Sequence, residues 1–310
     1  MGRLTSTVKW RRRKSEDVID IRGAGGRGGG PRRGGGLPIP GGLAGGGGTI
    51  GIVLVIVVIA LQVLGGGGGF DIGDAIAPGA GAPGASNPQP IPAGQDPQRE
   101  LRDFSVYVFE DAQDTWRGIF EAGGQPYAKA QLVLYSGAVS TQGCGGATSA
   151  VGPFYCPADD RIYLDLSFYR DMERQLNAPG DFAWAYVIAH EMGHHVQDVV
   201  GTNEEVRREQ ESDRDEANEL SVRLELQADC YSGVWASSVF AQGDLEEGDL
   251  DEAFTASEAV GDDRLQQQAG REIDLDSFTH GSSEQRRGWF TDGYESGNPD
   301  SCDTFSPDEV

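Results

Sequence analysis

The chain has 310 residues and a formal net charge of −24, from 49 acidic and 25 basic residues. Its 47 glycines and 15 prolines are concentrated before about residue 97, which excludes a compact core from that part of the chain. An ordered unit is therefore expected in the remaining residues, about 210 in number, which suffice for one sizeable core.

Residues 1–36 are interpreted as a basic cytoplasmic segment. Residues 1–33 contain ten Lys or Arg and three acidic residues, a net charge of +7, so the rest of the chain carries −31. A basic segment can bind nucleic acid, but here an apolar stretch follows closely and offers a simpler explanation. We therefore expect no nucleic-acid partner. Residues 37–48 form a glycine-rich linker without secondary structure.

Residues 49–64 are predicted to form one transmembrane helix in the lipid bilayer. This stretch is aliphatic, and no charged residue occurs between Arg33 and Asp71. It is slightly shorter than the usual span of about 20 residues, but flanking glycines can extend it. Positive charge before the span and acidic sequence after it place the N-terminus in the cytoplasm and the C-terminal domain outside the cell membrane. A cleaved signal peptide and a buried strand are the alternatives, and the late start of the apolar core without a small-residue cleavage site favours the anchor.

Residues 65–96 are rich in Gly and Pro and are expected to tether a domain formed by residues 97–310. Apolar patterning in this domain predicts one helix and three strands before residue 167, over residues 100–120, 130–135, 154–156 and 161–166. After residue 248 it predicts two short helices, over 249–260 and 264–269, and a last helix capped by Ser282 or Ser283.

The segment Ala-His-Glu-Met-Gly-His-His-Val-Gln at 189–197 lies in a predicted helix that begins at Gly180-Asp181 and ends at Gly201. On a helix, His190 and His194 project from one face and are spaced to bind a single metal ion. Two neutral imidazoles suit Zn²⁺, and the neighbouring Glu191 can take a proton from a water on the metal. The alternative is a core helix whose histidines are merely hydrogen-bonded.

A catalytic zinc site needs a third protein ligand and one open position. The best candidate is Glu225, in a helix-like stretch from about 213 to 240, where it shares a face with Asp229. We assign Glu225 to the metal, and Asp229 to a hydrogen bond with the free N–H of a ligating imidazole. The alternative is a solvated helix face, which the apolar neighbours of Glu225 argue against.

All four cysteines follow the apolar stretch, on the side predicted to be oxidising, so disulfides are expected. We favour pairing Cys144 with Cys156 and Cys230 with Cys302, because the first pair joins a loop to the strand pair and the second ties the tail to the ligand helix. The sequence alone leaves three connectivities open. A cysteine-bound zinc is disfavoured because the chain has no Cys-x-x-Cys pair.

The order H-E-x-x-H followed by E-x-x-A-D on the next helix resembles the gluzincin branch of zinc peptidases. More closely, the chain resembles the bacterial putative neutral zinc metallopeptidase family. The matching motifs are VKW at 8–10, CG at 144–145, GPFYC at 152–156, YLD at 163–165, HEMGHHVQ at 190–197, ELQADC at 225–230 and FTHGSS at 278–283. The resemblance implies an α+β fold, a mainly helical zincin-like domain with a small β-sheet, whose edge strand aligns a peptide beside one zinc ion per chain.

The resemblance also implies a catalytic role for His280, which would donate a hydrogen bond to the oxyanion of a tetrahedral intermediate with support from Arg286. The alternative is a surface histidine before a capped helix. His195 is turned about 100° away from His194 around the helix, so we expect a structural role for it.

These features predict a membrane-anchored zinc peptidase that hydrolyses a peptide or protein substrate, with Glu191 as general base. One alternative is a zinc-stabilised, non-catalytic ectodomain that binds a cell-envelope partner. Another places the function in residues 1–33, which would contact cytoplasmic partners or anionic lipid. Both are disfavoured because neither requires Glu191 or the pair formed by Glu225 and Asp229.

Overall fold

The computed structural model describes residues 8–25, 90–92 and 94–306. The chain folds as a mainly helical α+β protein with one four-stranded and one two-stranded sheet in these ranges. The predicted span, residues 49–64, lies outside the described residues, as do the linker at 37–48 and most of the tether at 65–96. Within the described ranges, no helix combines the length and the apolar character needed to cross a bilayer.

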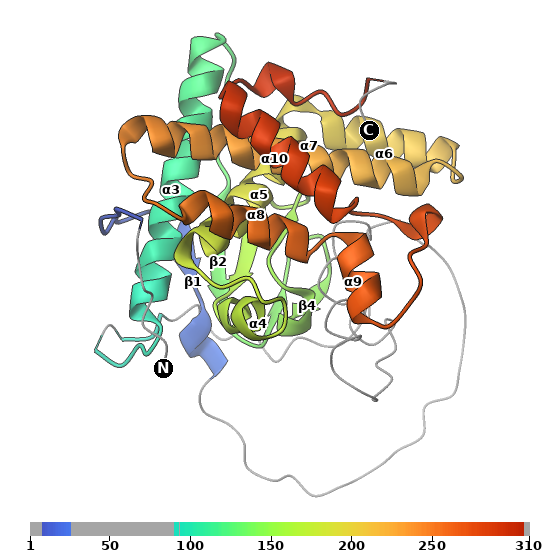
Figure 1. Ribbon diagram of the computed structural model, residues 1–310. Helices are drawn as coiled ribbons and strands as arrows, with labels where there is room; N and C mark the ends of the chain where they lie inside the picture. The colour runs from blue at the N-terminus through green and yellow to red at the C-terminus, as the bar shows by residue number, and fades with distance from the viewer. Residues whose placement is uncertain (1–7, 26–89, 93, 307–310) are drawn as a thin grey trace, which may run out of the picture.

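Helices make up most of the structure, as Figure 1 shows. The α-helices are α3 (Arg99–Ala122), α4 (Phe168–Arg174), α5 (Asp181–Val200), α6 (Thr202–Ser212), α7 (Ala217–Gln242), α8 (Asp249–Ala259), α9 (Asp262–Gln268) and α10 (Ser283–Ser296). Single 3₁₀ turns are η1 (Arg22–Gly25), η2 (Ser149–Val151), η3 (Leu275–Ser277) and η4 (Pro299–Ser301). The helices predicted near residues 100–120, 249–260 and 264–269 are confirmed as α3, α8 and α9.

The larger sheet has the strand order β1-β2-β6-β5. Its strands are β1 (Val18–Asp20), β2 (Gln131–Tyr135), β5 (Phe154–Cys156) and β6 (Arg161–Asp165). The first three in this order run parallel to one another, and β5 is an antiparallel edge strand. Because successive side chains of a strand point to opposite faces, the sheet contributes to two cores. One face packs on the helices through Leu132, Leu134, Ile162 and Leu164, and the other packs on a second, smaller core through Val133, Tyr135 and Tyr163.

The second core lies under a hairpin of β3 (Ala138–Ser140) and β4 (Gly146–Thr148). It contains a disulfide between Cys144 and Cys156, with Cα atoms 6.0 Å apart. A small hairpin cannot bury much apolar surface by itself, so the disulfide fixes it to the edge strand β5.

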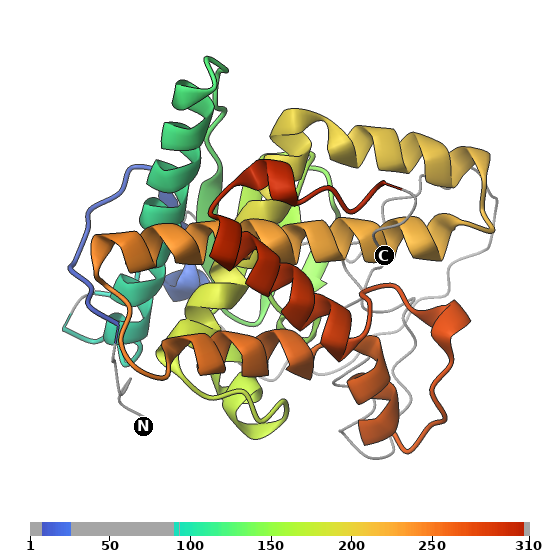
Figure 2. The same ribbon diagram turned by 45° about the horizontal axis from the view of Figure 1, so that its top comes forward.

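Helix α5 is the central element, because it contacts α3, α7 and α8 and also the strands β5 and β6. It ends at Gly201, whose φ of 91° gives the left-handed cap that the sequence predicted. α6 follows and runs back beside α7, while α10 crosses α7, as Figure 2 shows. α10 begins with a capping box formed by Ser282 and Gln285, in agreement with the predicted cap.

Three glycines allow α5, α7 and α10 to approach closely. A Cβ at Gly193 of α5 would lie 2.9 Å from the carbonyl oxygen of Ala228 on α7. A Cβ at Gly233 or Gly293 would overlap backbone atoms across the contact between α7 and α10. The separations of these three helices are therefore set by backbone contact, which leaves little freedom for the side chains that they bring together.

Residues 8–25 belong to the folded unit, which corrects the separation of residues 1–36 from a domain that starts at residue 97. Strand β1 pairs with β2, and the backbone N–H of Val8 donates to the Asp181 carboxylate at 3.2 Å. The buried guanidinium of Arg22 pairs with Asp20 at 2.8 Å and with Asp96 at 2.7 Å. Sequence patterning missed this because the partners of residues 8–25 in the rest of the fold lie more than 70 positions away along the chain.

Candidate metal centre

Two adjacent helices bring the three predicted ligands together. His190 and His194 come from α5 and Glu225 from α7, and the relative exposure of each is 4% or less. The Nε2 atom of His190 lies 3.2 Å from Glu225 Oε2, and the Nε2 atom of His194 lies 3.5 Å from Glu225 Oε1. One carboxylate thus faces both imidazoles.

This donor set fits zinc. Tetrahedral ligands about 2.1 Å from a zinc ion lie about 3.4 Å from one another, close to the separations seen between the imidazoles and Glu225. The buried Nε2 of His194 has no hydrogen-bond partner among the described residues. A buried polar atom without a partner is costly unless a ligand satisfies it, so the site is complete only with a cation between the three side chains.

Hydrogen bonds at the Nδ1 atoms orient both imidazoles. Nδ1 of His190 lies 2.9 Å from Asp229 Oδ1, and Nδ1 of His194 lies 2.9 Å from Gln197 Oε1. Gln197 donates its amide N–H to the carbonyl of Leu224 at 2.7 Å, so its Oε1 is the acceptor. In the form that binds a cation, both histidines therefore carry their one proton on Nδ1 and direct the lone pair of Nε2 at the shared position.

The two imidazoles have different electrostatic surroundings. Burial lowers the pKa of His194 to about 4, which keeps this ring neutral. Burial also lowers the pKa of His190, but the carboxylates of Asp229 and Glu225 outweigh it and raise the value to about 9. Cation binding at His190 must therefore displace a proton.

Glu191 lies beside the ligands and has a free oxygen. It is 5% exposed, and its Oε2 atom has no hydrogen-bond partner in the described part of the chain. Burial is the main cause that raises the pKa of Glu191 to about 7, while the charge of His190 and the backbone N–H of Tyr155 oppose the rise. A carboxylate with a pKa near neutrality can both accept and release a proton.

Arg286 of α10 holds Asp229 in place from the other side. Its side chain is 1% exposed, and its Nε lies 2.9 Å from Asp229 Oδ2. The Tyr186 hydroxyl donates to Asp229 and accepts from Arg286 at 3.1 Å. Arg286 also lies 3.9 Å from Glu225, so its charge acts on both carboxylates. Arg286 is predicted to support His280, whereas its contacts in the structure are with Asp229, Tyr186 and Glu225.

His280 is buried rather than on the surface, at 2% exposure. Its Nδ1 lies 3.0 Å from Asp262 Oδ1, and the backbone N–H groups of Thr279 and His280 both donate to Asp262 Oδ2 at 2.7 Å. The charge of His280 contributes to lowering the pKa of Glu225, although burial opposes this and His194 has the larger effect. His280 is thus within electrostatic reach of Glu225.

His195 does not join the cluster. Its Nε2 lies 2.8 Å from the carbonyl of Ala128 and its Nδ1 lies 3.2 Å from the Tyr155 hydroxyl. Both ring nitrogens are therefore used between α5 and the strand region, in keeping with the structural role expected for it.

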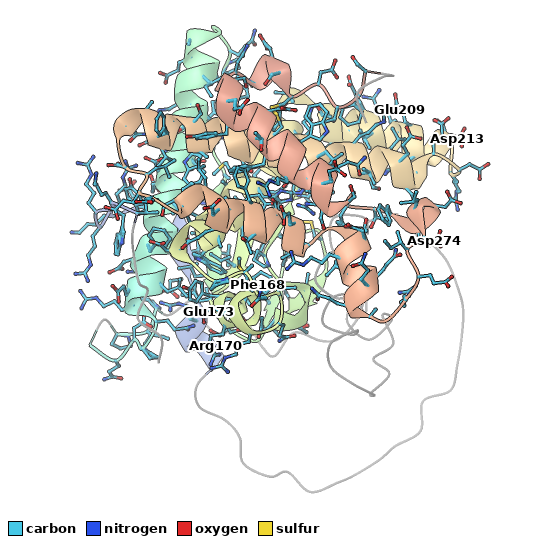
Figure 3. The ribbon with its side chains drawn as sticks, viewed as in Figure 1. Phe168, Arg170, Glu173, Glu209, Asp213 and Asp274 are labelled. Atoms are coloured by element: carbon cyan, nitrogen blue, oxygen red, sulfur yellow. A yellow bond between two sulfur atoms is a disulfide. The ribbon has the colours of Figure 1, made fainter. Side chains whose placement is uncertain are left out.

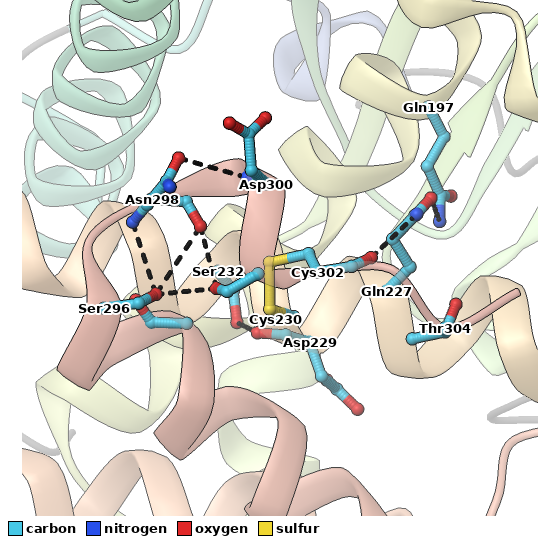
Figure 4. Close-up of a disulfide and its surroundings, with 12 residues drawn as sticks. Gln197, Gln227, Asp229, Cys230, Ser232, Ser296, Asn298, Asp300, Cys302 and Thr304 are labelled. Carbon is cyan, nitrogen blue, oxygen red and sulfur yellow. Dashed lines mark hydrogen bonds between the residues drawn. A yellow bond between two sulfur atoms is a disulfide. The ribbon is translucent and has the colours of Figure 1, made fainter. Parts of the chain in front are cut away.

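The second disulfide fixes the ligand helix to the C-terminal tail. Cys230, next to Asp229, is bonded to Cys302, as Figure 4 shows. Gln227 on the same helix donates to the carbonyl of Cys302 at 2.9 Å. The structure forms both disulfides that the sequence favoured.

Sequence reasoning missed Gln197, Tyr186 and Asp262. Gln197 lies three residues after His194, so helical spacing gave a usable signal. Tyr186 lies four residues before His190 and gave the same kind of signal. The sequence gave no such signal for Asp262, because its contact with His280 depends on how the loop after α9 folds back.

The sequence matches the family described as "Putative neutral zinc metallopeptidase" over residues 8–305. The curated protein YpfJ of Escherichia coli (strain K12), described as uncharacterized, is 52% identical over 207 residues, which cover 66% of this chain and 72% of YpfJ. Two mycobacterial proteins with the same description, Mb2605 of Mycobacterium bovis and Rv2575 of Mycobacterium tuberculosis (strain H37Rv), are each 41% identical over 224 residues, which cover 69% of this chain and 73% of each relative. No solved structure matches this chain.

Proposed function

Because this chain belongs to the putative neutral zinc metallopeptidase family, we propose that it hydrolyses peptide bonds with one zinc ion held by His190, His194 and Glu225. The observation that carries the proposal is the convergence of these three buried ligands beside Glu191, whose Oε2 has no other partner among the described residues. A purely structural zinc site would not need a buried carboxylate with a free oxygen next to the ligands.

When bound, the ion supplies Lewis acidity that activates water and polarises a carbonyl group. Glu191 is the proton carrier in this proposal. Its free Oε2 takes the proton from the attacking water and passes it to the leaving amine, which its pKa near 7 permits in both directions.

We assign His280 to stabilisation of the oxyanion. Because Nδ1 of His280 is held by the carboxylate of Asp262, the ring is fixed in orientation. Nε2 is then the atom left to donate toward the substrate. Arg286 and Asp229 act through His190, whose ring they fix.

The proposed path of the peptide follows the edge strand β5. This strand ends the sheet on the side of α5, and the backbone of Tyr155 within it contacts Glu191. An extended peptide added beside a sheet edge is held by main-chain hydrogen bonds, which would place successive carbonyls past the metal ligands.

The test replaces Glu191 with Gln, which keeps the shape of the side chain but removes the proton acceptor. Glu191→Gln is expected to retain one zinc per chain and to lose at least about a hundredfold in the rate of peptide hydrolysis. The matched control is Glu205→Gln on α6, where the native glutamate is exposed. Zinc is measured by atomic absorption and hydrolysis by mass spectrometry of a peptide mixture.

The results separate the candidate functions. Undiminished hydrolysis in Glu191→Gln would sink the assignment of the general base. Zinc in the native protein without hydrolysis of any peptide would favour the non-catalytic, partner-binding alternative. Absence of zinc from the native protein would contradict both the peptidase proposal and the partner-binding alternative.

A further inference from the structure

A small apolar pocket opens beside Glu191 and His190. Its lining comes from α4 with the turn after it, the C-terminal part of α8 and the part of α5 that carries Glu191, together with Pro153 before β5 and Arg286 of α10. Phe168 and Met172 lie one helical turn apart on the buried face of α4, and Leu176 follows them. Figure 3 labels Phe168, together with Arg170 and Glu173 of the same helix. Ala256 and Val260 close the opposite side.

The polar groups of the pocket are neighbours, because His190, Tyr186 and Arg286 all contact Asp229 and Glu191 adjoins His190. Glu191, His190 and Arg286 border it where it meets the metal ligands, and the other walls are aliphatic or aromatic carbon, apart from the Tyr186 hydroxyl, which is engaged with Asp229. A ligand here would have a polar part at the metal and an apolar part directed into the pocket. A peptide with its scissile carbonyl at the metal has this shape, because the side chain of the adjacent residue projects away from the backbone.

The size of the pocket limits the side chain. The space open to the centres of water molecules is about 40 Å³, which is enough for about three waters. Water in such a site lacks the two to four polar partners that it needs, so an apolar group displaces it favourably. A branched aliphatic side chain of three or four carbons fits this space, whereas an indole ring does not, and a carboxylate would face burial beside Glu191.

We propose that this pocket binds a short, branched aliphatic side chain, as in valine or leucine, of the substrate residue next to the scissile bond. The proposal rests on the proposed peptidase function, since it takes the metal ligands as the point at which the peptide is held. Met172, Leu176 and Val260 determine the specificity, because they are apolar lining residues that lie outside the ligand helices α5 and α7.

The test uses binding as well as turnover. Amino-acid hydroxamates with leucine, valine, glycine, tryptophan or aspartate side chains attach to a zinc ion through the same group and differ only in what they present to the pocket. We expect the leucine and valine compounds to bind the zinc-loaded protein at least tenfold more tightly than the other three, measured by calorimetry. Peptides that vary only at one residue beside the cleaved bond should follow the same order in kcat/KM.

Val260→Phe fills the pocket without touching the ligands. It is expected to retain zinc and to reduce the preference for leucine over glycine by about tenfold in both assays. The matched control is Val200→Phe, the same substitution at a valine that is 52% exposed at the end of α5. This control should leave the preference unchanged.

Each outcome decides one question. Equal binding of all five hydroxamates, or an unchanged preference in folded Val260→Phe, overturns the pocket assignment and leaves the peptidase proposal standing. The expected binding order without hydrolysis of any peptide supports the pocket and overturns the peptidase proposal. Failure of every hydroxamate to bind overturns both.

Discussion

Single residues fix the geometry of the metal site through contacts that do not involve the metal. His190 is held by Asp229, and Asp229 is held in turn by Arg286 and Tyr186. The contact between His190 and Asp229 could be predicted from the sequence. Each residue lies on a predicted helix, four positions from another candidate, His194 or Glu225. The contribution of Arg286 was not predictable in the same way, since it depends on how α10 crosses α7.

Asp229→Asn tests whether the charge of Asp229 beside His190 supports zinc binding. The amide can still accept from His190, but the charge that polarises the imidazole and balances Arg286 is lost. We expect zinc affinity to fall about 10- to 100-fold, measured by competition with a chelating dye. Asp292→Asn, at an exposed position on α10, is the control. A folded Asp229→Asn protein with native zinc affinity would show that the charge of Asp229 has no role in binding.

At the scale of the elements, the start of α5 shows where local sequence rules fail. The helix begins where the sequence predicted, with Gly180 as the N-cap residue, but Asp181 accepts from Val8 and no side chain at the cap position bonds the helix. Glu252 of α8 takes that place and accepts from the backbone N–H of Phe182 at 2.9 Å. Helix type and length were predictable from patterning, whereas a cap supplied by another helix was not.

The capping carboxylate gives a prediction about pH. Burial is the main cause that raises the pKa of Glu252 from 4.5 to about 7, with help from Asp181 and Asp249 and against the backbone N–H groups it accepts from. The pKa of Glu252 is higher in the folded state than in the unfolded state. Its contribution to stability is therefore fully present below about pH 4.5 and is lost as the pH rises through 7. Glu252→Gln keeps an acceptor for Phe182 and cannot ionise.

When the pH is raised from 5 to 8, the stability of Glu252→Gln relative to that of the native protein is therefore expected to increase. The gain should be about 2 kcal/mol, after allowance for the partial exposure of the carboxylate. Urea unfolding at both pH values measures it, with Glu247→Gln at an exposed position just before α8 as the control. A difference between native and variant that does not change with pH would contradict the assignment.

At the scale of the whole molecule, the basic N-terminal segment has partners within the acidic domain. Arg12 pairs with Asp103, Arg13 with Asp114, and Arg22 with both Asp20 and Asp96. From the sequence alone, the excess of positive charge near the N-terminus is interpreted as a signal of membrane orientation. Several of these basic residues attach residues 8–25 to the fold. No local pattern indicates such pairing, because a charge run reads the same whether it faces solvent or a partner.

The attachment also bears on localisation. The sequence predicts a cytoplasmic N-terminus and an extracytoplasmic domain, separated by one crossing at residues 49–64. Pairing of β1 with β2 requires residues 18–20 and 131–135 to lie on the same side of any membrane. The pairing and the predicted orientation therefore exclude each other in one molecule with a single crossing.

Arg22→Ala tests the attachment. The variant leaves Asp20 and Asp96 with side-chain exposures of 6% and 3% and without their buried cation. We expect the free energy of unfolding of the full chain to fall by about 3–5 kcal/mol, measured by chemical denaturation. Arg12→Ala is the control, because the Arg12 side chain is 61% exposed and its ion pair should contribute less than about 1 kcal/mol. Equal stability of the two variants would mean that residues 8–25 do not pack on the domain.

The close approach of α5, α7 and α10 at their glycines has a thermodynamic consequence. Since backbone contact, a disulfide and the bonds around Arg286 already position the ligand side chains, the entropy of ordering them is lost during folding rather than during metal binding. Zinc would then act as a ligand of a folded protein and add about 2.7 kcal/mol at a hundredfold excess over its Kd. Chelation should accordingly lower the melting temperature and leave the fold intact, unlike the collapse of a domain whose structure the metal itself creates.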